Sequence, residues 1–151
     1  MATTNNNSSH SSIDRLPPQN LEAETALLGC LMLDKDAIIK VADQLIPDDF
    51  YDYRHRVIYE AVLELFTRNV SIDVLTVANG IEEKKLTDKV GGSSYLATLV
   101  NSVPSAAHAT YYASIVRKKG TLRRLIQSAS EITNLAFTEE GEIETILDNA
   151  E

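Results

Sequence analysis

The stretch RLPPQNLEAETALLG, residues 15–29, marks the point where an irregular leader ends and the first helix begins. Its two prolines cannot lie inside a helix, and the side chain of Gln19 or Asn20 can accept the first free backbone N–H groups. Glu22 and Glu24 place negative charge where the N-terminus of a helix favours it. The leucines that follow form an apolar stripe, so the stretch predicts a capped amphipathic helix.

The composition changes on either side of this stretch. Residues 1–14 are rich in Asn, Ser and Thr and carry little apolar surface, so we predict a disordered leader there. After residue 20 the chain reads as one helix after another, with no sustained strand-like alternation. The predicted fold is all-α: a small multi-helix globular head over residues 15–103, followed by an antiparallel helical hairpin over residues 104–151 with a truncated second arm.

Local signals within the head predict where its elements begin. We expect helices over about residues 36–45 and 54–67, another that starts after the cap Asp73, and a short one that starts near Ser93. The stretch PDDFY, residues 47–51, is expected to form a turn with a short helical start, in which Phe50 fills the core.

The C-terminal third contains a long amphipathic helix with no proline, from Ala106 to about residue 137. Its apolar residues, Ile126 and Ile132 among them, recur at spacings of three and four, which keeps them on one face. A helix of this length cannot be covered by a small head, so it needs a partner. Gly120 interrupts the run of good helix formers and is expected to mark a bend or a close helix contact.

Charge is unevenly distributed along the chain, whose net charge is −8. Residues 1–88 carry 8 basic and 15 acidic side chains, residues 89–130 carry 6 basic and no acidic ones, and residues 131–151 carry 7 acidic and no basic ones. The strongest local feature is a basic cluster in the long helix. It consists of Arg117, Lys118, Lys119, Arg123 and Arg124.

Two interpretations of this basic cluster stay open. In the first it is a solvated helix face that pairs with acidic side chains of a neighbour. In the second it binds an acidic partner or nucleic acid, although the acidic total argues against a general nucleic-acid-binding module.

The sequence argues against an enzyme site in this segment. It has no G-x-x-x-x-G-K-[ST] phosphate loop, and its three histidines are scattered without metal-ligand spacing. The single cysteine, Cys30, is expected to be a small core residue. No apolar run is long enough for a membrane span or a signal peptide, so we expect a cytoplasmic protein without membrane contact. We predict no catalytic, cofactor-binding or metal-binding residues.

A set of short motifs follows in one order along the chain and resembles the N-terminal domain of the bacterial replicative DNA helicase, the DnaB family. After the helix start at residues 15–29, these motifs are PDDFY at 47–51, His55 with Ile58-Tyr59, Ile72-Asp73 with Thr76-Val77, GGSSYL at 91–96, YASIV at 112–116 and LRRLI at 122–126. Each motif is weak alone, and the order makes the set specific.

The resemblance implies a non-catalytic collar and docking domain. In that family the domain assembles subunits into a hexameric ring, typically as a trimer of dimers, and binds the C-terminal domain of primase. A RecA-like ATPase domain, which would bind ATP and Mg²⁺, is absent from this segment and is expected in the parent protein, an ATP-dependent replicative helicase. A helicase loader is a further possible partner, and direct DNA contact by this segment is expected to be weak or absent.

Four residues are expected to contact partners: Glu22 on the first helix, Tyr95 at the junction of head and hairpin, and Ile126 and Ile132 on the hairpin. Plain core packing, or helix-start electrostatics for Glu22, would explain each of them equally well. Two other classes of function remain as alternatives. One is a nucleic-acid-binding helical module that uses residues 117–124, and the other is a stand-alone helical adaptor that never carried a motor.

Overall fold

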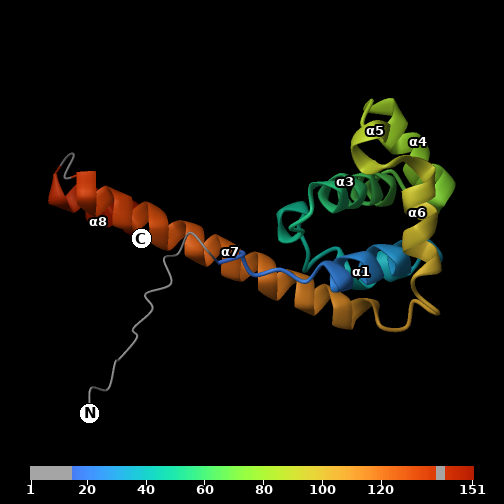
Figure 1. The fold of residues 1–151 in the computed structure, drawn as a ribbon, viewed down its shortest axis with the longest axis horizontal. Helices are drawn as coiled ribbons and strands as arrows, with labels where there is room; N and C mark the ends of the chain where they lie inside the picture. The colour runs from blue at the N-terminus through green and yellow to red at the C-terminus, as the bar shows by residue number, and fades with distance from the viewer. Residues whose placement is uncertain (1–14, 139–141) are drawn as a thin grey trace, which may run out of the picture.

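Figure 1 shows the computed structural model, which describes residues 15–138 and 142–151, as a helical head from which one long helix projects. The described residues contain helices and no strand, which confirms the all-α prediction. The head comprises α1 (Leu21–Leu33), α2 (Ala37–Val41), a short 3₁₀ helix η2 (Pro47–Asp49), α3 (Tyr53–Thr67), α4 (Val74–Glu83), α5 (Thr87–Val90) and α6 (Gly92–Asn101). The predicted leader at residues 1–14 and the connection at residues 139–141 lie outside the described residues.

Side-chain caps set where three of the helices begin. The Asn20 carboxamide oxygen accepts a hydrogen bond of 2.9 Å from the backbone N–H of Ala23, at the start of α1. Asp73 accepts the N–H of Thr76 at the start of α4, and the Thr76 hydroxyl accepts the N–H of Asp73 in return. Asp52 caps α3 in a similar way. The predicted caps Asn20 and Asp73 are confirmed, and each satisfies a backbone donor that would otherwise lack a partner.

The segment between α2 and α3 turns inward, as the PDDFY motif predicts. Phe50 is 1% exposed, and its ring centroid lies 5.0 Å from that of Tyr59. The Tyr59 hydroxyl donates to the carbonyl oxygen of Leu45 at 2.8 Å. The helix expected over residues 36–45 is shorter, because the chain leaves helical geometry after Val41 and brings Leu45 into the core. The sequence also gave no indication of the four-residue helix α5.

Helix α1 packs against α2, α3, α6 and α7. Leu27, Leu28 and Leu31 are fully buried, and burial of each contributes about 2 kcal/mol to folding. Gly29 lets α6 approach closely, since a Cβ atom at this position would lie 2.3 Å from the carbonyl oxygen of Leu99. The leucines provide the burial, and the glycine sets the distance between the two helices. Cys30 is also fully buried, which confirms its expected place in the core.

The predicted long helix exists as α7 (Ala109–Thr138), and α8 (Ile143–Ala150) packs against it. In Figure 1, α7 passes alongside α1 and then continues far beyond the head, with α8 near its free end. The first half of α7 belongs to the head core, because Ala109, Ala113 and Val116 are almost fully buried. The division of domains at residue 103 stays a prediction, with the qualification that the head core uses this half of α7.

Candidate protein-interaction site

The junction between the head and α7 is a tight polar contact with η2. Gly120 is buried there, and a Cβ atom on it would lie 2.7 Å from the Cα atom of Asp49. One turn further along, the guanidinium of Arg123 donates to the carbonyl oxygens of Pro18 and Asp49, each at 2.8 Å. Arg124 forms an ion pair of 2.9 Å with the Asp49 carboxylate, whose side chain is 2% exposed. These contacts fix where α7 leaves the head.

Gly120 therefore marks a close contact, one of the two roles expected for it, and α7 continues through it as a single helix. The contact is with η2. Any side chain at position 120 of α7 would collide with the Asp49 backbone. The same carboxylate also accepts the backbone N–H of Ile46 at 2.9 Å, so Asp49 caps η2 while it pairs with Arg124.

The basic cluster does not act as one surface. Arg123 and Arg124 are half-buried, and they bind acceptors on η2 of the same chain. Lys119 is also half-buried, whereas Arg117 and Lys118 are exposed. The nucleic-acid interpretation stays a prediction, with two of its five cations already engaged with the head.

A second polar chain connects α1, α3 and α6 inside the head. Glu24 and His55 are each 1% exposed, and a Glu24 carboxylate oxygen lies 2.8 Å from Nδ1 of His55. His55 Nε2 lies 2.6 Å from the hydroxyl of Tyr95. The Glu24 carboxylate also accepts the backbone N–H groups of Tyr51 at 2.9 Å and Asp52 at 3.3 Å. His55 and the two backbone N–H groups thus supply hydrogen-bond partners to the buried Glu24 carboxylate, and the bond from His55 to Tyr95 extends the chain to a third helix.

Tyr95 lies on α6 against α3, so its predicted place at the junction of head and hairpin is wrong. The guanidinium of Arg54 sits 4.3 Å from the centroid of its ring, and Arg54 also pairs with Asp52 at 2.9 Å. Burial raises the pKa of Tyr95, and the nearby charge of Arg54 only partly opposes this. The ring remains half-exposed. Tyr95 is therefore a neutral, partly exposed aromatic side chain at the surface of the head.

Glu22 is exposed on the first turn of α1, as expected for a contact residue or for a residue that interacts with the helix terminus. It stands beside an open groove between α1 and the beginning of α7. Pro104, Tyr112 and Ile115 line the same groove and make it partly apolar. Within the described residues, Glu22 forms no hydrogen bond or ion pair with Tyr95, Ile126 or Ile132, the other three predicted contact residues.

The projecting part of α7 carries the other two predicted contact residues on its exposed surface. Ile126 is 53% exposed and Ile132 is 41% exposed. Further large apolar side chains on α7 and α8 are more exposed still: Leu125 at 64%, Phe137 at 83%, Ile143 at 73% and Leu147 at 61%. These four are not among the predicted contact residues, although Leu125 belongs to the same repeat of three and four as Ile126.

Among the described residues, no group of three or more His, Cys, Asp or Glu side chains could hold a metal ion. None of the helices in residues 15–138 and 142–151 is long and apolar enough to cross a membrane. The predicted contact residues thus lie on three surface features: the exposed apolar face of α7 and α8, the groove beside Glu22, and the partly exposed ring of Tyr95.

A globular helical head continued by a long helix, along which a shorter helix packs, defines a head-and-hairpin domain. Residues 16–118 match the family model described as the DnaB-like helicase N terminal domain. The chain therefore belongs to this family, as its ordered set of motifs indicated.

Curated relatives agree with this assignment. The chain is 47% identical over 138 residues to the replicative DNA helicase DnaC of Bacillus subtilis and 41% identical over 138 residues to the replicative DNA helicase DnaB of Geobacillus stearothermophilus. Each alignment covers 91% of this chain and 30% of the relative. The chain thus spans less than a third of the length of these proteins.

Solved structures share the fold. The crystal structure of the N-terminal domain of DnaB helicase from Mycobacterium tuberculosis matches with a TM-score of 0.85 and 41% identity, over 89% of this chain and 94% of that one. A structure reported as a DnaB-like replicative helicase and its interactions with primase matches with a TM-score of 0.73 and 24% identity, over 86% of this chain and 30% of that one. The second likeness shows the fold alone.

Proposed function

We propose that this domain is the collar and docking domain of a replicative DNA helicase, which assembles subunits into a hexameric ring and binds the C-terminal domain of primase. The observation that carries the proposal is the row of large apolar side chains exposed on the projecting part of α7 and on α8. The ATP- and Mg²⁺-dependent motor would belong to another domain of the parent protein.

The energetics of α7 support self-association through the hairpin. Beyond Arg124 the helix is largely exposed and packs against α8 within the described part of the chain, and isolated helices are marginal in water without packing of their apolar face. Covering one Ile, Leu or Phe side chain contributes about 1.5–3 kcal/mol. Two copies that cover each other's exposed faces would gain this contribution several times over, enough to offset the entropic cost of association.

The relatives of this chain support primase as the proposed partner. The curated relatives are replicative DNA helicases, and one solved structure with the same fold concerns a helicase and its interactions with primase. In this proposal Ile126 and Ile132 contribute apolar contacts on the hairpin, and Glu22 and Tyr95 contribute polar and aromatic contacts on the head. A helicase loader is a further proposed partner of the parent protein.

The test replaces Ile126 with glutamate, which places a charge on the exposed apolar face without removing any buried side chain. The matched control is Gln127→Glu, which adds the same charge one residue away, about 100° around the helix. Ile126→Glu should lower the mass measured by light scattering and weaken binding of the C-terminal domain of a bacterial primase, whereas Gln127→Glu should leave both unchanged. An unchanged mass and unchanged primase binding for Ile126→Glu would refute the proposal.

A further inference from the structure

Lys118 lies at the head end of the exposed apolar face of α7. Spacings of seven residues separate Lys118, Leu125 and Ile132, which keeps these side chains within about 40° of one another around the helix. Leu125 is 64% exposed and Ile132 is 41% exposed, and Lys118 is exposed as well. Gly120, which is buried against η2, lies about 200° around the helix from Lys118. Lys118 therefore points away from the head, on the same side of α7 as the exposed apolar face.

The acidic helix α8 of the same copy is too far from Lys118 to neutralise it. None of the ion pairs in the described part of the chain includes Lys118. Helix α8 packs near the free end of α7 (Figure 1), where Glu151 and Ser128 line one groove. Ser128 lies about 15 Å along the helix from Lys118. This separation exceeds the Debye length of about 8 Å at physiological ionic strength, so the two charges are largely screened from each other within one copy.

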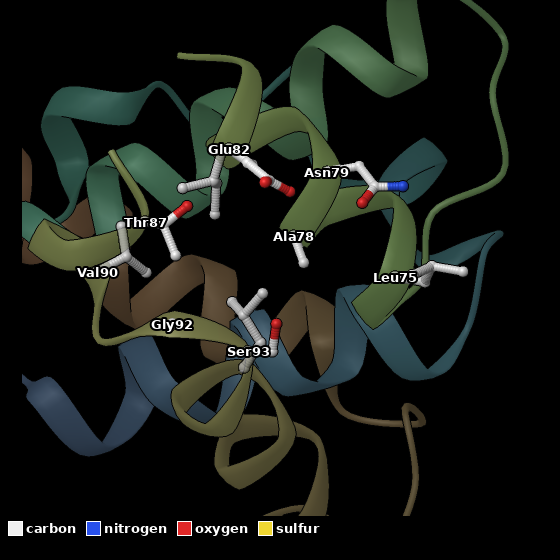
Figure 2. A pocket seen from close by; sticks show the side chains of 10 residues that line it. Leu75, Ala78, Asn79, Glu82, Thr87, Val90, Gly92 and Ser93 are labelled. Carbon is white, nitrogen blue, oxygen red and sulfur yellow. The ribbon is translucent and has the colours of Figure 1, made fainter. Parts of the chain in front are cut away.

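The far end of the hairpin has the opposite charge to Lys118. Residues 131–151 carry 7 acidic and no basic side chains, and Glu142 and Glu144 are exposed at the beginning of α8. The head surface shows no such excess of one sign at the pocket between α4, α5 and α6 in Figure 2, because residues 82–89 beside it carry three acidic and three basic side chains. Lys118 thus complements the acidic end of the hairpin, and it does so on the face along which a second copy would pack.

The orientation of two copies decides whether Lys118 meets an acidic side chain. In a parallel pair each Lys118 would lie beside its own counterpart, and the two ammonium groups would repel each other. In an antiparallel pair Ile126 of one copy can face Ile132 of the other, with a two-fold axis midway between these positions. Lys118 then lies about 16 Å from the axis, and the last residue of α7, Thr138, lies about 14 Å from it. Lys118 of one copy therefore reaches the far end of the hairpin of the other.

We propose that Lys118 of one copy binds the acidic end of the hairpin of a second copy, beside Glu142 and Glu144. This inference rests on the self-association proposed above, and it adds the ion pairs that make the association antiparallel. By symmetry the contact forms twice, once at each end of the shared apolar face. Because salt screens exposed ion pairs, the association weakens as the ionic strength rises.

Charge reversal, with the preceding residue as a matched control, tests this contact in the full chain by sedimentation equilibrium. Lys118→Glu should raise the dimer Kd about tenfold at about 0.1 M salt, because it turns attraction into repulsion at both contacts. Arg117→Glu changes the net charge equally at a side chain that is also exposed but lies about 100° away, off the apolar face, and should raise the Kd less than about threefold. At about 1 M salt, where the Debye length is about 3 Å, the two variants should associate equally.

Exchanging the charges within one chain tests the identity of the acidic partner. The triple variant Lys118→Glu, Glu142→Lys, Glu144→Lys restores opposite charges at both contacts of an antiparallel pair. Its dimer Kd should therefore return to within about threefold of the original value.

Spin labels measure the orientation directly. Thr121 is exposed, and Cys30 is buried, so a label can be attached to Thr121→Cys alone. Electron paramagnetic resonance should give a separation of about 25 Å between the two labels of an antiparallel pair, against about 10 Å for a parallel pair.

The outcomes separate this inference from the proposed function. A dimer that Lys118→Glu leaves unchanged, equal effects of the two single reversals at about 0.1 M salt, failure of the triple variant to restore the Kd, or labels about 10 Å apart would each overturn the inference and leave self-association standing. A monomeric original chain would contradict both.

Discussion

Replacing Gly120 with alanine should destabilise the domain, although alanine is the better helix former. The added methyl group would lie 2.4 Å from Oδ1 and 2.7 Å from Cα of Asp49. The side-chain oxygen could move, but the Cα atom belongs to the backbone of η2, so α7 and η2 must separate. That movement would also stretch the ion pair between Asp49 and Arg124.

The magnitudes determine the sign of the effect. Alanine in place of glycine contributes about 1 kcal/mol to a helix interior. Overpacking a closely fitted contact costs about 1–3 kcal/mol, and disturbing a pair that includes an almost fully buried carboxylate adds to this cost. We therefore expect a net loss of about 2 kcal/mol in the free energy of unfolding. For a chain of this size this loss corresponds to a Tm lower by about 4–8 °C.

Urea unfolding and thermal unfolding of Gly120→Ala measure this directly, and Gly80→Ala is the matched control. Gly80 lies within α4, where a Cβ atom would meet only the Ala61 Cβ atom at 3.9 Å. The control should gain up to about 1 kcal/mol, so the same substitution has opposite signs in two helices. If Gly120→Ala were as stable as the original protein or more stable, the close contact between α7 and η2 would be refuted.

Two further predictions concern the polar contacts of the head. Glu24→Ala leaves His55 and two backbone N–H groups without their acceptor, so urea unfolding should show a loss of about 3 kcal/mol, whereas the exposed Glu22→Ala should change stability by less than about 0.5 kcal/mol. Equal losses would contradict the role of the buried carboxylate. For Asp52, burial would raise the pKa, but hydrogen bonds from the Arg54 side chain and backbone lower it below its ordinary value. Charged Asp52 therefore stabilises the fold above about pH 4, and this contribution is lost as the pH falls. Asp52→Asn should thus reduce the change in urea midpoint between about pH 6 and about pH 3, and an unaltered change would argue against this pair.

Much of the fold could be predicted from the sequence because the signals for it connect residues that are close along the chain. Asn20 and Asp73 cap helices through hydrogen bonds to residues three positions away, so residue type and spacing sufficed to predict them. Phe50 could be placed in the core because a large aromatic side chain between two amphipathic helices has few other places to go. The long helix followed from a repeat sustained over about thirty residues.

The candidate site was only partly predictable for the opposite reason. Ile126 and Ile132 are exposed as the excess length of their helix indicated. Tyr95 was misplaced because its position depends on a hydrogen bond to His55, a residue 40 positions earlier in the chain. Arg123 could not be separated from its exposed neighbours, since its acceptors on Pro18 and Asp49 lie more than 70 positions away.

The stretch at residues 15–29 contains both kinds of contact: local ones that the sequence predicts, and long-range ones that only the structure shows. By itself the sequence determined that a helix starts there, with a cap, acidic residues and an apolar stripe, because those interactions connect residues within one or two turns. Only the tertiary structure decided that Gly29 admits the carbonyl oxygen of Leu99, that buried Glu24 binds His55, and that Pro18 anchors Arg123. These contacts join segments distant in sequence, and their geometry exists only once the helices have packed.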